Sequence, residues 1–88
     1  MNTLEFFKMD IGVTHNKRDA YFQGLIESAK KGLEEKGIEL DENLVEDQFL
    51  IADYAAWQYR NRDNNNDIPN NLRLRIRNRI VKARSGNV

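Results

Sequence analysis

The 88-residue sequence contains no cysteine and only one histidine. A chain without cysteine has no disulfide framework, no thiolate zinc site and no cysteine nucleophile. One imidazole is too few for a polyhistidine metal centre within one chain. The sequence also lacks a serine nucleophile elbow, a P-loop glycine cluster and a calcium-binding loop. We therefore predict a protein that is not an enzyme and that has no metal site.

Long hydrophobic runs are also missing. No apolar stretch approaches the ~18–20 residues that cross a bilayer, and the first residues lack the basic segment that opens a signal peptide. We therefore expect neither a membrane span nor an export signal. Because domains usually run about 50–200 residues, we predict a single domain over residues 1–88, with residues 85–88 frayed.

The whole chain has no net charge, but its two parts carry opposite net charges. Lys and Arg total 14, and Asp and Glu total 14. Residues 1–58 hold 6 cations and 12 acids, a net charge of −6, whereas residues 59–88 hold 8 cations and 2 acids, a net charge of +6. Most late cations are arginines, whose guanidinium fork suits carboxylates and phosphates. This end is either balanced within the fold, or contacts an acidic surface of another copy, or contacts nucleic acid.

The spacing of the apolar residues predicts an all-α, compact bundle of about four helices. A short first helix is predicted from Thr3 to about Met9, with Thr3 as the N-cap. The second helix has an apolar stripe at positions 22, 25, 26, 29 and 33, and Gly37 suits the left-handed position after its end. The third helix, residues 44–60, is apolar around most of its circumference. We expect it to be central in the bundle or to be covered in part by another subunit.

The last segment, residues 72–84, fits two kinds of structure. Residues 72–80 alternate apolar and polar side chains with the period of two that is typical of a strand. Leu72, Ile76 and Ile80 also lie on one helical face, and Pro69 before the segment and Gly86 after it favour a helix. We predict a helix here, with an extended segment as the alternative.

An acidic residue within the apolar third helix is a candidate for a structural ion pair. Asp53 stands between two residues of that helix that are not charged, and a lone carboxylate is costly when it is buried without a partner. Arg60 follows two turns later on a similar face, so we predict an Asp53–Arg60 pair. Arg77 and Arg79 of the last segment are the alternative partners.

Aromatic and basic residues form the other candidate sites. Tyr54, Trp57 and Tyr59 are spread around the third helix among alanines, which favours packing in the core or at an interface over stacking on nucleobases. The arginines of the last segment are spread around their helix rather than gathered on one face, which argues against reading of the major groove. We predict that they contact another subunit or a DNA channel: Arg73, Arg75, Arg77 and Arg79.

Two segments together carry a resemblance to a known family. An Asp-Tyr-Ala-Ala-Trp-x-Tyr-Arg-x-Arg segment occupies residues 53–62, and a basic segment follows at 72–80. They come after an acid-led second helix that ends at Gly37. This order of features, over about residues 3–84, resembles the small head–tail connector (adaptor) proteins of tailed bacteriophages and prophages.

The resemblance implies a structural virion protein that binds no cofactor and no small-molecule substrate. Such a protein assembles as a ring of identical copies between portal and tail and extends the DNA channel. The implied partners are other copies, the phage portal and tail-completion proteins, with non-specific contact to packaged DNA and no membrane. The implied location is the head–tail interface of the virion, after synthesis in the cytoplasm of the bacterial host. The alternative function is a small nucleic-acid-binding regulator that uses the Arg-rich C-terminal segment.

Overall fold

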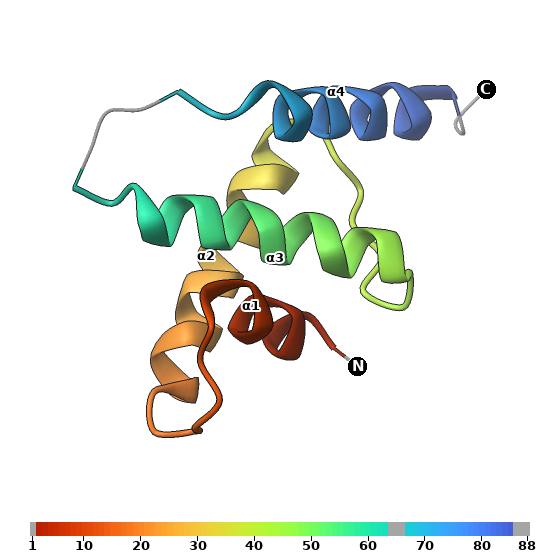
Figure 1. The fold of residues 1–88 in the computed structure, drawn as a ribbon. Helices are drawn as coiled ribbons and strands as arrows, with labels where there is room; N and C mark the ends of the chain where they lie inside the picture. The colour runs from red at the N-terminus through yellow and green to blue at the C-terminus, as the bar shows by residue number, and fades with distance from the viewer. Residues whose placement is uncertain (1, 64–66, 86–88) are drawn as a thin grey trace.

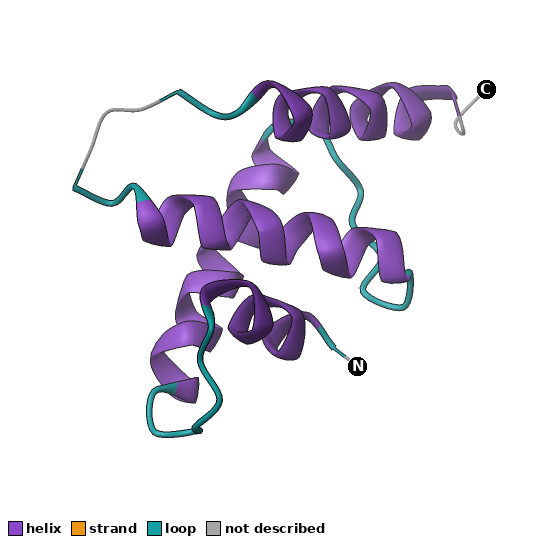
Figure 2. Ribbon diagram, viewed as in Figure 1, coloured by secondary structure: helices purple, strands orange, loops and turns teal. Residues whose placement is uncertain are grey.

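The structure is a computed structural model of the chain that describes the backbone of residues 2–63 and 67–85 and the side chains up to residue 82. Within these residues it contains four α-helices and no strand (Figure 2): α1 (Thr3–Ile11), α2 (Asp19–Glu35), α3 (Val45–Arg60) and α4 (Asn70–Ser85). The predicted all-α bundle is thereby confirmed. Of the residues that were expected to fray, Ser85 ends α4, and residues 86–88 lie outside the described residues.

Helix α3 is the centre of the bundle. Figure 1 shows it between α1 and α4, with α2 crossing behind it. Helices α1 and α2 both pack on α3 and on each other, whereas α4 packs mainly on α3. The largest apolar side chains with almost no exposed surface are Phe7, Phe22, Ile26, Leu33 and Ile51. These residues place the core where α1, α2 and α3 meet, and α4 covers a further face of α3 with Leu72 and Ile76.

Three aromatic rings join three helices at the middle of this core. The ring of Phe7 from α1 lies 5.2 Å from that of Phe22 from α2 and 6.0 Å from that of Tyr59 from α3, measured between centroids. Phe22 and Tyr59 meet edge to face at 5.9 Å. Tilted and edge-to-face pairs are favoured arrangements because the edge of one ring is attracted to the face of the next. Phe7 has no exposed surface, so its ring is a fully buried point of attachment between α1 and the bundle.

The ends of the first two helices follow from local chemistry. Asn2, rather than the predicted Thr3, caps α1: its backbone is extended, and its Oδ1 accepts a hydrogen bond from the Glu5 N–H at 3.0 Å. Thr3 is already the first helical residue, so its side chain is one position too late to serve as the cap. After α2, Gly37 has φ = 99°, which confirms the predicted left-handed glycine at this end.

The last segment is a helix, as predicted, and the extended alternative is wrong. Leu72 and Ile76 are buried against α3 and Ile80 is half-buried, whereas Leu74 is 55% exposed. A strand would have placed Leu72, Leu74 and Ile76 on one face, but a helix separates Leu74 from the other two. The helix starts just after Pro69, whose carbonyl accepts a hydrogen bond from the Arg73 N–H at 2.9 Å.

The interior of α2 offers a test of its helical propensity. Gly24 is helical, and a Cβ added there would meet no atom within 4 Å. We expect Gly24→Ala to raise the free energy of unfolding by roughly 0.5–1 kcal/mol, since alanine loses less backbone entropy in a helix. Gly37→Ala is the matched control: the space around Gly37 is equally open, but its φ of 99° disfavours alanine, so stability should fall by about 1 kcal/mol. Urea unfolding followed by circular dichroism measures both, and a loss for Gly24→Ala would contradict the prediction.

Candidate interaction surface

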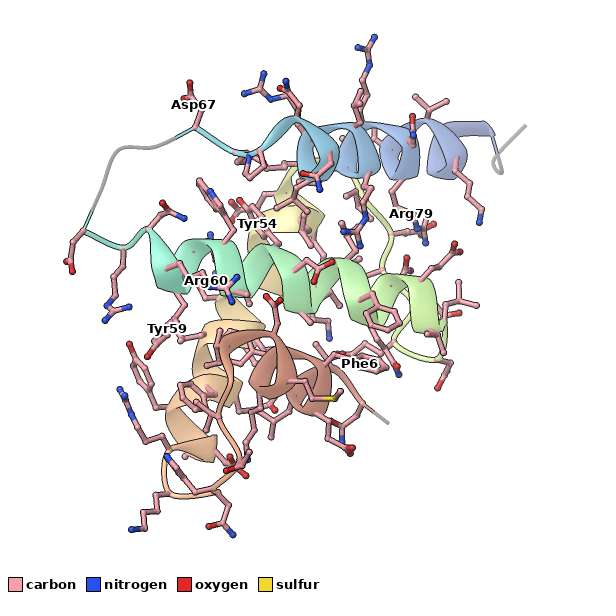
Figure 3. The ribbon with its side chains drawn as sticks, viewed as in Figure 1. Phe6, Tyr54, Tyr59, Arg60, Asp67 and Arg79 are labelled. Atoms are coloured by element: carbon pink, nitrogen blue, oxygen red, sulfur yellow. The ribbon has the colours of Figure 1, made fainter. Side chains whose placement is uncertain are left out.

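A buried ion pair attaches α4 to α3. The Asp47 side chain of α3 is only 1% exposed, and the Arg79 side chain of α4 is 14% exposed. Arg79 donates from Nε and Nη2 to the two oxygens of Asp47, at 2.8 Å each, which is the bidentate geometry that arginine forms with carboxylates. Figure 3 shows Arg79 reaching from α4 toward the beginning of α3.

Backbone groups of the segment between α2 and α3 complete this site. Asp47 Oδ2 also accepts a hydrogen bond from the Asp41 N–H at 2.9 Å, and Arg79 Nη2 donates to the carbonyl of Glu39 at 2.8 Å. Burial raises the pKa of Asp47. The hydrogen bonds from Arg79 and Asp41, together with the charges of Arg79 and Lys82, outweigh burial and hold that pKa below its usual range. Asp47 is therefore an ionised carboxylate that connects α3, α4 and the loop before α3.

Two exposed ion pairs continue this contact along α4. Arg75 donates to Asp53 at 2.6 Å, and Lys82 donates to Glu46 at 3.0 Å. The side chains of both pairs are between 35% and 64% exposed, so each pair contributes little to stability, about 0–1 kcal/mol. They lie along the side of α4 that faces α3 and add little to the strength of the contact.

The predicted Asp53–Arg60 pair is therefore wrong. Seven residues of helix place the two Cα atoms roughly 10 Å apart, and each side chain has a nearer partner on a neighbouring helix. Asp53 pairs with Arg75 of α4, and Arg60 donates to the Asp10 side chain of α1 at 3.2 Å and to its carbonyl. Neither alternative partner, Arg77 or Arg79, pairs with Asp53 in the described structure.

Packing divides the arginines of α4 into two pairs with different surroundings. Arg75 and Arg79 are held by carboxylates of α3. Arg73 and Arg77 are exposed and have no hydrogen-bond or ion-pair partner among the residues that the structure describes. Two apolar side chains, Leu74 and Val81, stand on the same side of the helix and are each 55% exposed. We call Arg73, Leu74, Arg77 and Val81 the outer face of α4.

The three aromatic residues of α3 lie on its inner sides. Tyr54 is buried, and Trp57 and Tyr59 are half-buried against the core. The rings of Tyr54 and Trp57 are stacked, with centroids 6.1 Å apart, and the Arg62 guanidinium lies over the Tyr59 ring at 4.5 Å. Figure 3 shows Tyr54 and Tyr59 on different sides of α3. They offer no continuous row of exposed faces on which nucleobases could stack.

A second apolar surface crosses from α1 to the beginning of α3. The rings of Phe6 and Phe49 are stacked with centroids 4.0 Å apart, yet Phe49 remains 43% exposed. Val45, one turn before Phe49, is 56% exposed, and Met9, one turn after Phe6, is 67% exposed. We call Phe6, Met9, Val45 and Phe49 the apolar strip. Helix α3 is thus central in the bundle, as expected, but its first two turns have an uncovered side.

A groove adjoins the apolar strip between α3 and α4. Its volume is about 530 Å³, and Phe49 and Leu50 of α3 provide its apolar lining. The ion pairs Asp53–Arg75 and Glu46–Lys82 line the same groove. The strip therefore continues into a depression whose charged groups are already paired.

Neither a metal-binding cluster nor a membrane-spanning helix is found in the described part of the chain. It contains no group of three or more His, Asp or Glu residues that could hold a metal ion. None of its helices is long and apolar enough to cross a membrane.

Two of these features were missed from the sequence. Asp47 lies on the stripe of Leu50, Ile51 and Tyr54, and Arg79 lies on the stripe of Leu72 and Ile76. These two charged residues on otherwise apolar stripes were the sequence feature from which the buried Asp47–Arg79 pair could have been predicted. The uncovered side of α3 had no such signal, because an all-round apolar helix does not show which side its neighbours leave open.

The described fold is that of a small α-helical bundle with exposed apolar side chains on α1, α3 and α4. A family model described as phage gp6-like head-tail connector protein matches residues 1–82. The chain therefore belongs to that family, and the resemblance noted from the sequence is confirmed. No curated protein and no solved structure matches the chain. The family is structural, and membership makes the chain a component of the phage particle that contacts other head and tail proteins.

Proposed function

We propose that this protein forms a ring of identical copies between the portal and the tail of a phage particle and extends the channel for DNA. It acts there as one domain, without enzyme activity, after synthesis in the cytoplasm of the host cell. Membership of the connector family over residues 1–82 carries the proposal. The outer face of α4 and the apolar strip support it, because a small protein with two exposed surfaces of different composition is suited to contact neighbours on both sides.

Arg73 and Arg77 are the arginines that we assign to contact with a neighbouring subunit or with DNA. Arg75 and Arg79 are held by Asp53 and Asp47, so they are less available to a partner. This division also weakens the alternative of a nucleic-acid-binding regulator. Affinity for duplex DNA rises with the number of phosphates that free cations neutralise, and the internal pairs reduce that number on α4.

Native mass spectrometry of the protein tests the ring. The protein is measured over a concentration series alone, with duplex DNA, and with the purified portal protein. We expect multimers of one defined copy number, formed alone or on the portal and independent of duplex DNA. A monomer that changes only when duplex DNA is added would favour the regulator instead. A monomer under all three conditions would contradict the ring.

Charge reversal on the outer face of α4 tests the assigned arginines. We expect Arg73→Glu with Arg77→Glu to weaken ring formation or retention of packaged DNA by about tenfold or more, because arginines at interface centres are frequent hot spots. The free energy of unfolding should change by less than about 0.5 kcal/mol, since both side chains are exposed. Lys17→Glu with Lys31→Glu is the matched control, because it changes the charge equally at exposed positions elsewhere. Normal rings and normal DNA content in the arginine variant would refute the assignment.

A further inference from the structure

We propose that the outer face of α4 of one copy docks on the apolar strip of the next copy. The inference rests on the ring of the proposed function and names the two surfaces that would form its repeated contact. Both surfaces carry exposed apolar side chains: Met9, Val45, Phe49, Leu74 and Val81 are between 43% and 67% exposed. In contact, each surface would shield the apolar side chains of the other from water. Burial of apolar surface is the main favourable contribution to the free energy of association.

The charges of the two surfaces are complementary. The outer face of α4 contributes Arg73 and Arg77, which have no acidic partner in the described part of their own chain. Beside the apolar strip lies Glu5, whose carboxylate is exposed and equally without a partner among the described residues. Glu5 neighbours Phe6 in sequence and stands one turn before Met9. An arginine-bearing face is therefore matched by an apolar surface with a free carboxylate at its edge.

Like-with-like contacts fit these surfaces less well. Two outer faces of α4 in contact would bring Arg73 and Arg77 of one copy against the same arginines of the other, and like charges across an interface are costly. Interface centres are enriched in aromatic residues, methionine and arginine, and only the mixed contact combines all three. Phe6, Met9 and Phe49 come from one copy, and the arginines come from its neighbour.

The position of the two surfaces allows a chain of contacts. Leu72 and Ile76 pack against α3, so the outer face of α4 is directed away from α3, while the apolar strip lies across α1 and the beginning of α3. Figure 1 shows α1 and α4 on opposite sides of α3. One copy can therefore use both surfaces at once with two different neighbours. Such head-to-tail contacts close into rings when the rotation between copies allows it.

Engineered disulfides test the pairing in a protein that has no cysteine of its own. Val45→Cys is mixed with Leu74→Cys or with Val81→Cys under mild oxidation, at a concentration or on a portal where the wild type is assembled. We expect a cross-linked heterodimer in at least one mixture and little dimer from Val45→Cys alone. Glu27→Cys on the exposed side of α2 is the control partner. Equal cross-linking of Glu27→Cys, or a dominant Val45–Val45 dimer, would overturn the pairing.

A second experiment uses surface disruption instead of cross-linking. Val45→Asp with Phe49→Asp disables the strip, and Leu74→Asp with Val81→Asp disables the outer face of α4. Each variant alone should associate about 10- to 100-fold more weakly than the wild type, yet a mixture should form heterodimers, because one intact surface of each kind remains. Circular dichroism confirms that both variants are folded. Rings that persist in both variants would overturn this pairing and leave the proposed ring intact, whereas a wild type that never assembles would overturn the ring itself.

Discussion

Replacing Phe7 by alanine is expected to remove a large part of the stability of the protein. Phe7 has no exposed surface, and its ring contacts Phe22 of α2 and Tyr59 of α3. Truncation of a buried phenylalanine to alanine costs about 3–5 kcal/mol, because apolar contacts are lost and a cavity remains. Small proteins are stable by only roughly 0.05–0.15 kcal/mol per residue. Urea unfolding followed by circular dichroism should therefore show a transition shifted to much lower urea or already complete in buffer.

The same helix supplies the control for this substitution. Met9 is 67% exposed, so Met9→Ala should change the free energy of unfolding by no more than about 0.5 kcal/mol. In Phe7→Leu the leucine fills much of the space of the phenylalanine, so its loss in the free energy of unfolding should lie between those of Phe7→Ala and Met9→Ala. Similar losses for Phe7→Ala and Met9→Ala would mean that α1 is not attached to the bundle through the Phe7 ring.

Periodicity and turn chemistry were sufficient to predict the helices. The stripe through Phe22, Ile26 and Leu33 identifies the buried side of α2, and Gly37 marks its end. The last segment was harder, because residues 72–80 satisfy the period of a strand and of a helix together. Pro69 resolves this ambiguity correctly, since a proline suits the start of a helix. These features depend on a few neighbouring residues, which a sequence displays directly.

Contacts between helices could not be predicted in the same way. Asp53 and Arg60 share one side of α3, but each side chain reaches a different neighbouring helix. Which neighbour a side chain meets depends on how the helices cross, and sequence spacing within one helix does not contain that information. The same reason explains why four arginines that look equivalent in sequence divide into Arg75 and Arg79, held within the fold, and Arg73 and Arg77, exposed on its surface.

Removal of Arg79 is expected to be the most damaging change to a charged residue. Arg79→Met would leave the Asp47 carboxylate, which is 1% exposed, with only the Asp41 N–H as a donor. Breaking a buried ion pair from one side costs about 3–5 kcal/mol, because the remaining charge is neither solvated nor paired. Arg79 retains some exposure to water, so we expect a loss of about 3 kcal/mol in the free energy of unfolding, measured by urea titration at neutral pH.

Arg75→Met is the matched control, since Arg75 occupies the same helix and pairs with an exposed carboxylate. It should cost no more than about 1 kcal/mol. Equal losses in the two variants would contradict the assignment of Asp47 and Arg79 as the anchor of α4.

Measurements at acidic pH distinguish loss of the Asp47–Arg79 ion pair from a general disturbance of packing in Arg79→Met. The pKa of Asp47 is lowered in the folded protein, so its ionised form stabilises the fold above the unfolded pKa, about 3.9. That contribution is lost as the pH falls through the lower folded value. In Arg79→Met the buried carboxylate favours its protonated form, so acid relieves the cost of the substitution. The stability difference between wild type and Arg79→Met should therefore shrink as the pH is lowered, beginning above the unfolded pKa of about 3.9 and continuing below it. A difference that stays constant would show that the methionine disturbs packing rather than the ion pair.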